Sequence, residues 1–243
     1  MDFYPTLITL AVALSAGSLA RRCGALPALT HTLILTLAAV MCGRMGYVAL
    51  NLEYFRGHPW EIAQLAQTGG LSAHGALLGA LAAHTMRRTA RGWDTLLPLA
   101  LLGSAASLGC IAHGCGHGRE LFWTDGPWWR LAVDWPDLSG IANPRLPAQL
   151  FLTGWLATAL AGAYALRWRP SPISAAAMFA AGDCLVQFSQ ADAMPVIAGL
   201  RSAQWIDIAI LCAAAAVAGA RLTAGGMYAA HARTSVSNRD AQT

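Results

Sequence analysis

Long apolar segments, separated by short polar stretches, constrain most strongly how this chain can fold. A helix needs about 17 to 25 predominantly apolar residues to cross a hydrocarbon core of roughly 30 Å. Seven segments meet this requirement, near residues 4–20, 28–50, 70–86, 95–112, 147–166, 171–190 and 203–220. Only 12% of the residues are charged, which is about half the usual fraction. The sequence therefore predicts an all-α polytopic membrane protein, a bundle of about seven transmembrane helices with external loops.

The polar stretches between these segments are too short to hold a separate soluble domain. We therefore expect a single transmembrane domain over residues 1–222. Residues 223–243 end in the polar run TSVSNRDAQT, and we expect them to form a short, disordered cytoplasmic tail.

The arginines predict how the bundle lies in the membrane. All 16 basic side chains are arginine. If the segments alternate in direction, ten arginines lie on one side and five on the other, while Arg44 lies inside a span. Basic residues favour the cytoplasmic side, so we predict a multi-pass protein with its N-terminus outside and its C-terminus in the cytoplasm. The net charge of +4 then follows from topology and does not indicate a nucleic-acid partner.

Two longer loops are expected on the outer side, over residues 51–68 and about 113–146. The first mixes aromatic and charged residues, and the second is rich in tryptophan. Its tryptophans are Trp123, Trp128, Trp129 and Trp135. Because Trp and Tyr favour the headgroup level, the second loop is predicted to lie against lipid headgroups, either as a lid or as an aromatic belt that anchors the bundle.

A polar face is predicted within the second segment. In a helix Arg44, Tyr47 and Asn51 occupy positions i, i+3 and i+7, which share one side. Ionisable residues at membrane depth usually face a partner or a water-filled cavity. A guanidinium can donate two parallel hydrogen bonds to a phosphate, so this face is predicted to hold a lipid phosphate. The alternative is a buried ion pair between Arg44 and an acid such as Asp183.

The run GGLSAHGALLGA, residues 69–80, places a histidine among glycines in an apolar segment. Gly69 and Gly70 could break the helix and leave N-terminal amides for an anion. The imidazole of His74 can take up a proton near neutral pH. A membrane histidine taken alone is more often a satisfied interhelical hydrogen bond, but beside the Arg44 face we predict that His74 handles a proton next to a lipid phosphate.

These motifs resemble a known family. GRMGYVALN (43–51) followed by GGLSAHGALLG (69–79) resembles the paired signature of bacterial prolipoprotein diacylglyceryl transferase. LGCIAHGCGHGRE (108–120) is more loosely similar to that family's long glycine-punctuated signature, and PRLPAQLF (144–151) to the motif that opens its next span. The seven-span layout with an external N-terminus agrees with this resemblance.

The resemblance implies an enzyme of the bacterial cytoplasmic (inner) membrane that moves the diacylglyceryl group of phosphatidylglycerol to the lipobox cysteine thiol of a preprolipoprotein. Its partners would be phosphatidylglycerol, membrane lipid and the lipobox signal peptide, and no cofactor or metal is expected. The implied catalytic residues are His74, as base or proton relay, and Tyr47, as a hydrogen-bonding partner. The implied substrate-binding residues are Arg44, Asn51, Gly70, Ser72, Arg119 and Arg145.

Some positions depart from the family's signature. In the long signature, the family has arginine in place of Ser107, asparagine in place of Cys110 and glutamate in place of Cys115. In the sixth segment, the family's arginine and glutamate align at about Asp183 and Gln187. Two interpretations stay open: a divergent transferase in which Arg119 replaces a lost arginine, or a relative with another acceptor or without catalysis.

A cluster of cysteines and histidines supports an alternative function. Cys110, His113, Cys115 and His117 bring two thiols and two imidazoles together, and these ligands suit Zn²⁺ or copper. Their spacing differs from common zinc motifs, and Cys110 and Cys115 could instead pair as a disulfide. The alternative is therefore a non-transferase relative that binds lipid or, through these residues, a metal.

Overall fold

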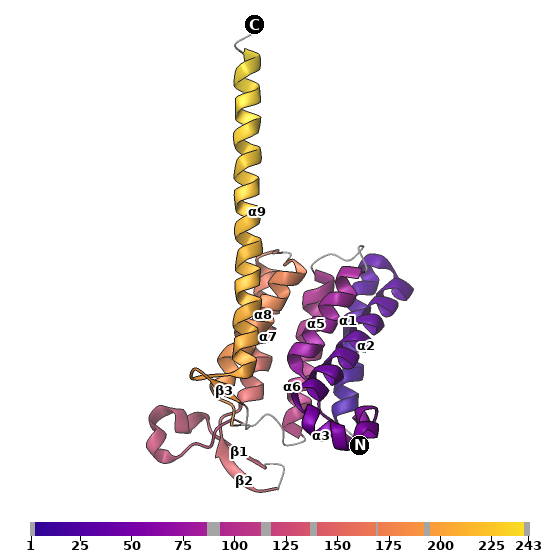
Figure 1. The fold of residues 1–243 in the computed structure, drawn as a ribbon, viewed down its shortest axis with the longest axis vertical. Helices are drawn as coiled ribbons and strands as arrows, with labels where there is room; N and C mark the ends of the chain where they lie inside the picture. Colours follow the sequence, from indigo (N-terminus) through magenta and orange to yellow (C-terminus); the bar gives the residue numbers. More distant parts are fainter. Residues whose placement is uncertain are drawn as a thin grey trace.

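The computed structural model describes residues 3–86, 93–112, 118–136, 140–168, 170–191 and 195–240. Each of the seven apolar segments contains a helix (Figure 1). These helices are α1 (Phe3–Cys23), α2 (Ala25–Leu50), α5 (Ala73–Met86), α6 (Trp93–Ala112), α7 (Ala148–Ala165), α8 (Pro172–Gln187) and α9 (Ser202–Asp240).

The connections between these helices carry short elements of their own. They are α3 (Leu52–Gly57), the 3₁₀ helix η1 (Pro59–Ile62), α4 (Leu65–Thr68), the 3₁₀ helix η2 (Trp123–Leu131), β1 (Val133–Pro136), β2 (Ala142–Arg145), β3 (Val196–Ile197) and β4 (Leu200–Arg201). The strands form two antiparallel pairs, β1 with β2 and β3 with β4. The all-α prediction therefore describes the bundle but misses the hairpins. Pro136 and Pro144 lie in β1 and β2 and disfavour a helix there.

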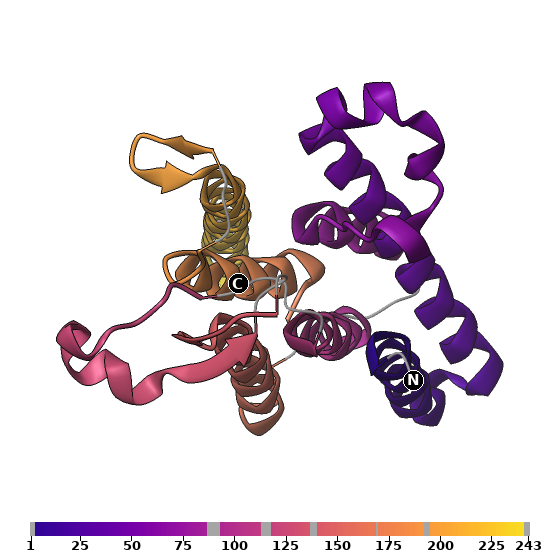
Figure 2. The same ribbon diagram turned by 90° about the horizontal axis from the view of Figure 1, so that it is seen from below.

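The helices pack in a chain of neighbours that closes on itself. Helix α2 packs against α1 and α5, α6 against α1 and α7, and α8 against α7 and α9, while α5 also contacts α8 (Figures 1 and 2). The largest buried apolar cluster lies between α5, α6, α7 and α8. Its members are Leu77, Ala100, Ala148, Leu152, Leu156, Ala176, Phe179 and Val186. This core brings α5 and α8 side by side, which positions the site described below.

Small residues let α2 and α5 approach closely. A Cβ atom built on Gly75 would lie 2.5 Å from the Cys42 carbonyl oxygen and 3.1 Å from Gly43 Cα. Small residues of this kind are typical of helix interfaces in membranes. Gly75 therefore holds the start of α5 against the middle of α2.

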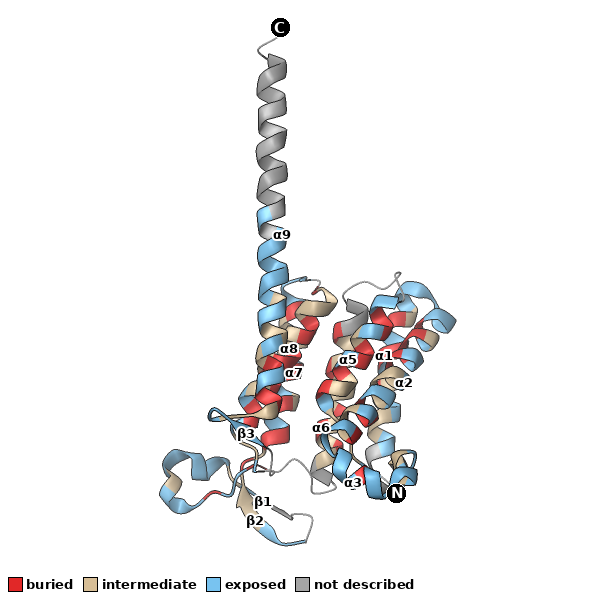
Figure 3. Cartoon of the chain, viewed as in Figure 1, coloured by how far each residue is buried: buried red, intermediate tan, exposed pale blue. Residues whose placement is uncertain are grey.

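Much of the outer face of the bundle is apolar and exposed (Figure 3). Among the described residues, two helical stretches are long and apolar enough to cross a membrane by length and composition, Ala25–Leu50 and Ser202–Arg221. Only 22% and 17% of their apolar windows are buried. A core helix of a soluble protein would be mostly buried, so these faces fit a lipid surround.

The chain termini lie at opposite ends of the molecule (Figure 1). The N-terminal end of α1 shares one end with α3 and the β1–β2 hairpin, whereas α9 extends beyond the bundle at the other end. Helix α9 continues to Asp240, and the disorder expected from residue 223 stays a prediction. Alanine is the strongest helix former, and no proline follows Pro195 to end the helix. The domain boundary at residue 222 stays a prediction.

Candidate functional site

His74 lies at the start of α5, where a local cap sets the backbone. Gly69 and Gly70 have positive φ angles of 61° and 80°, so the chain turns there before the helix begins. The Ser72 hydroxyl oxygen then accepts a hydrogen bond of 3.2 Å from the backbone N–H of Gly75, as an N-cap residue does. His74 follows within the first turn and is buried.

Two buried acids from other helices meet His74. Its Nε2 atom lies 2.9 Å from Oδ1 of Asp207 in α9 and 3.7 Å from Oδ2 of Asp183 in α8. The exposed fractions are 7% for His74, 4% for Asp183 and 0% for Asp207. We call these three residues the acid–histidine cluster. It ties three helices together in the interior, and the His74 imidazole lies between the two carboxyl groups.

Two glutamine side chains near the acids join α8 to the residues around the start of α9. Gln187 Nε2 donates to Asp183 Oδ2 at 3.2 Å, and Gln187 Oε1 accepts from Arg201 Nη1 at 3.2 Å. The Gln204 side chain accepts from the Arg201 backbone N–H at 2.9 Å and donates to the Cys184 carbonyl at 3.2 Å. These bonds fix α8 against the start of α9, which keeps Asp183 and Asp207 close together.

Among the described residues, no ion pair joins Arg44 to Asp183, which instead lies beside His74 and accepts a hydrogen bond from Gln187. The Arg44 guanidinium donates to backbone carbonyls of the segment after α2: Ile62 at 3.0 Å, Gly70 at 3.2 Å, and also Glu61 and Gly69. The alternative of an ion pair with Asp183 is therefore wrong. A buried guanidinium satisfied by carbonyls organises this segment around it.

The segment that Arg44 organises also carries a tyrosine whose ionisation is shifted. The Tyr54 hydroxyl donates to the Glu61 carboxylate at 2.7 Å. This hydrogen bond raises the pKa of Tyr54 above its ordinary value of 10.0, because the carboxylate favours the protonated phenol.

Tyr47, Asn51 and Gly70 lie around Arg44. The Tyr47 ring packs against Gly70, where any Cβ would overlap the ring, so glycine is required for both space and positive φ. The Asn51 amide donates to the Tyr47 carbonyl at 2.9 Å and caps the end of α2. The structure thus brings Arg44, Tyr47 and Gly70 together as expected, but Asn51 supports the backbone there.

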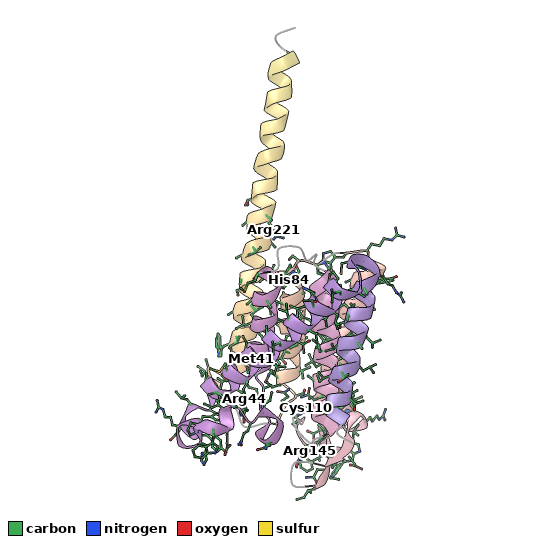
Figure 4. The ribbon with its side chains drawn as sticks, turned by 90° about the vertical axis from the view of Figure 1, so that its right-hand side faces the viewer. Met41, Arg44, His84, Cys110, Arg145 and Arg221 are labelled. Carbon is green, nitrogen blue, oxygen red and sulfur yellow. The ribbon has the colours of Figure 1, made fainter. Side chains whose placement is uncertain are left out.

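Arg119 and Arg145 lie together near the β1–β2 hairpin. Arg145 Nη2 is 2.7 Å from Glu120 Oε1. The Arg119 backbone donates to the Ser189 carbonyl and accepts from Leu146, while its side chain is exposed. Arg44 and Arg145 lie toward the same end of the bundle, far from Arg221 (Figure 4). That end also holds His74, since Ser72, two residues before it, is hydrogen-bonded to Gly43.

Of the four residues in the alternative cysteine–histidine metal site, the structure describes only Cys110. Cys110 is disulfide-bonded, so it offers no free thiolate to a metal. His113, Cys115 and His117 lie outside the described residues. The pairing of Cys110 with Cys115 stays a prediction, because Cys115 is in that group.

The sequence did not reveal the acid–histidine cluster. The sequence feature that could have indicated the cluster is the presence of Asp183 and Asp207 inside apolar segments, because acids at membrane depth usually pair with another polar group. The sequence predicts Asp183 as a possible partner of Arg44 and as a departure from the family's signature, and no prediction includes Asp207. The spacing along the chain carries no information on which buried polar groups meet across α5, α8 and α9.

Comparison with known proteins identifies the family. Residues 1–220 match the family model described as prolipoprotein diacylglyceryl transferase. The chain belongs to this family. The resemblance seen in residues 43–79 is thereby confirmed, and the match extends from α1 into α9.

Relatives in the prolipoprotein diacylglyceryl transferase family are about a third identical to this chain over the aligned residues. A phosphatidylglycerol-prolipoprotein diacylglyceryl transferase of Aromatoleum aromaticum is 36% identical over 165 residues, which cover 63% of this chain and 59% of that protein. Proteins of the same name from Bordetella parapertussis and Azoarcus sp. are 35% and 32% identical, and the alignments cover 72% and 76% of their lengths. The chain thus spans about three fifths of the first relative and about three quarters of the others.

Proposed function

We propose that this chain transfers the diacylglyceryl group of phosphatidylglycerol to the thiol of a lipobox cysteine in a preprolipoprotein. The family match over residues 1–220 carries this proposal. The relatives named above are phosphatidylglycerol-prolipoprotein diacylglyceryl transferases, and the chain contains a buried histidine held by a carboxylate, which such a reaction can use.

The reaction needs a group that removes the thiol proton, because the thiolate is the nucleophile. Asp207 holds Nε2 of His74 at 2.9 Å. We infer that Nε2 carries the ring proton and donates it to Asp207, which leaves Nδ1 as the proton acceptor. The carboxylate then stabilises the positive charge that the ring gains.

The transfer exchanges one carbon–oxygen bond for one carbon–sulfur bond. The thiol proton passes to His74, and the thiolate attacks the carbon of the diacylglyceryl unit that is bonded to the phosphate oxygen. A carbon–sulfur bond forms as the carbon–oxygen bond breaks, and glycerol phosphate leaves with its negative charge. Cationic donors placed where this charge develops lower the barrier.

Arg44, Arg119 and Arg145 are the proposed donors to the phosphate, and Tyr47 and Ser72 lie near Arg44. Arg119 is exposed and Arg145 already holds the Glu120 carboxylate. Arg44 is bonded to carbonyls, so a phosphate would have to displace one of them. Arg119 and Arg145 can therefore bind the leaving phosphate without giving up a backbone carbonyl. Arg44 supports the segment beside His74.

We further propose that all seven helices cross the bacterial inner membrane, with the N-terminus outside. The exposed apolar faces of α2 and α9 support this placement. The N-terminal end, Arg44 and Arg145 lie toward one end of the bundle, and Arg221 lies toward the other (Figures 1 and 4). The excess of arginine at the Arg221 end favours the cytoplasm for that side.

A transfer assay tests the function directly. The purified chain is incubated with phosphatidylglycerol labelled in its acyl chains and with a lipobox peptide that carries cysteine or serine at the acceptor position. We expect label on the cysteine peptide alone. His74→Ala should abolish labelling, whereas His84→Ala should retain it, because His84 is an equally buried histidine of the same helix outside the cluster. Absence of labelling by folded wild-type protein would refute the proposal.

A further inference from the structure

The acid–histidine cluster places two carboxyl groups and one imidazole close together in an apolar interior. Its nitrogen and two carboxylate oxygens all lie within 4.8 Å of one another. Moving an ionised carboxylate out of water is costly unless a cation or hydrogen-bond donors compensate it. One histidine can carry at most a single positive charge, so it cannot neutralise both ionised acids.

Asp207 shows where the compensation is incomplete. The residue is fully buried, and its Oδ1 atom has His74 as a partner. Its Oδ2 atom is also buried but has no hydrogen-bond partner among the described residues. Buried polar atoms are almost always paired in native proteins, so this oxygen lacks a partner of the kind that a cation would supply.

The ligand types and distances suit a divalent metal. One imidazole and two carboxylates form a three-ligand set that leaves a coordination position open, as at catalytic zinc sites. Two ligand atoms of a tetrahedral Zn²⁺ lie about 3.3 Å apart when each bond is about 2.0 Å. The His74 Nε2 atom lies 2.9 Å from the Asp207 oxygen and 3.7 Å from the Asp183 oxygen, so small side-chain rotations would bring all three atoms onto one ion.

We propose that His74, Asp183 and Asp207 bind a divalent cation of the Zn²⁺ type. The ion replaces the direct contact between His74 and Asp207 and gives the Asp207 carboxylate a charged partner. Because the three residues come from α5, α8 and α9, binding also ties these helices together.

The cation has a consequence for catalysis that rests on the proposed function. An ion on Nε2 requires that atom to be deprotonated, which moves the ring proton to Nδ1. Nδ1 then cannot accept the thiol proton. The metal-loaded protein is therefore the inhibited form of the transferase, and removal of the ion restores the histidine as a base.

Direct binding tests the site without reference to activity. The full chain in detergent is stripped with EDTA, freed of EDTA, and titrated with ZnCl₂ by calorimetry. Asp207→Asn and Asp183→Asn each remove a ligand while keeping the side-chain shape, and His84→Ala is the matched control. Partners behind metal ligands contribute about 10- to 100-fold to affinity, so each Asn variant should lose at least about 100-fold while the control binds like wild type.

The outcomes separate the site from the function. Equal zinc affinity in wild type and in both Asn variants, or no zinc binding by wild type, would overturn the metal site even if the protein transfers lipid. Zinc binding that needs both acids, in a protein that never labels the peptide, would keep the site and overturn the transferase. A thermal unfolding scan of each variant confirms folding, and either Asn variant suffices if the other does not fold.

Discussion

The contact between α2 and α5 allows a quantitative test through Gly75→Ala. The added methyl group would lie 2.5 Å from the Cys42 carbonyl oxygen, whereas ordinary contact begins near 3.4 Å. The obstructing atoms belong to the backbone of α2, which cannot rotate away. The helices must therefore separate by about 1 Å to reach ordinary contact.

The expected cost follows from two opposing effects. Overpacking of a tight interior costs about 1 to 3 kcal/mol, and a rigid backbone obstacle points to the upper part of that range. Replacing glycine by alanine in a helix contributes about 1 kcal/mol in the other direction. We expect a net destabilisation of about 2 kcal/mol, or a fall in Tm of about 4 to 8 °C for a chain of this size.

Thermal unfolding of the purified protein in one detergent measures this effect. Gly154→Ala in α7 is the matched control, because a Cβ there meets nothing within 4 Å, and its Tm should be unchanged or higher. Transfer by Gly75→Ala should also fall, since a displacement of about 1 Å in a reacting group can cost about 100-fold in rate. A Gly75→Ala protein as stable as the Gly154→Ala protein would show that α2 and α5 do not approach as described.

Three further changes probe the site and the segment beside it. Asp207→Asn in the metal-free protein should lower kcat for peptide labelling by about 100-fold with little change in KM, because it disturbs the proton transfer at His74 and not lipid binding; an equal change in KM would contradict this role. Arg44→Lys should lower the free energy of unfolding by about 2 kcal/mol, since an ammonium cannot serve four carbonyls arranged for a planar fork; urea titration measures it, and an unchanged midpoint would refute the bonding. Glu61→Gln should lower the pKa of Tyr54, followed by phenolate absorbance, because the carboxylate raises it in the wild type. The Tyr54 contribution to stability is present below pH 10.0 and is lost as the pH rises through the higher folded-state pKa.

Local features were predictable because they depend on neighbours along the chain. The positions of the seven long helices follow from apolar runs, and the turn at Gly69 and Gly70 from residues that tolerate positive φ. The shared face of Arg44 and Tyr47 follows from helical spacing. The short helices of residues 52–68 and the β1–β2 hairpin were not predicted, because brief polar segments carry no clear periodicity.

Sequence alone determined that this chain forms apolar helices, that it resembles the prolipoprotein diacylglyceryl transferases, and that His74 is a residue of interest. Tertiary structure decided which partners these residues have. Arg44 meets carbonyls, and His74 meets Asp207 from a helix 133 residues further along. Such pairings depend on how α5, α8 and α9 pack around a common core. Packing brings together residues that are far apart in the sequence, and their spacing along the chain does not predict the contact.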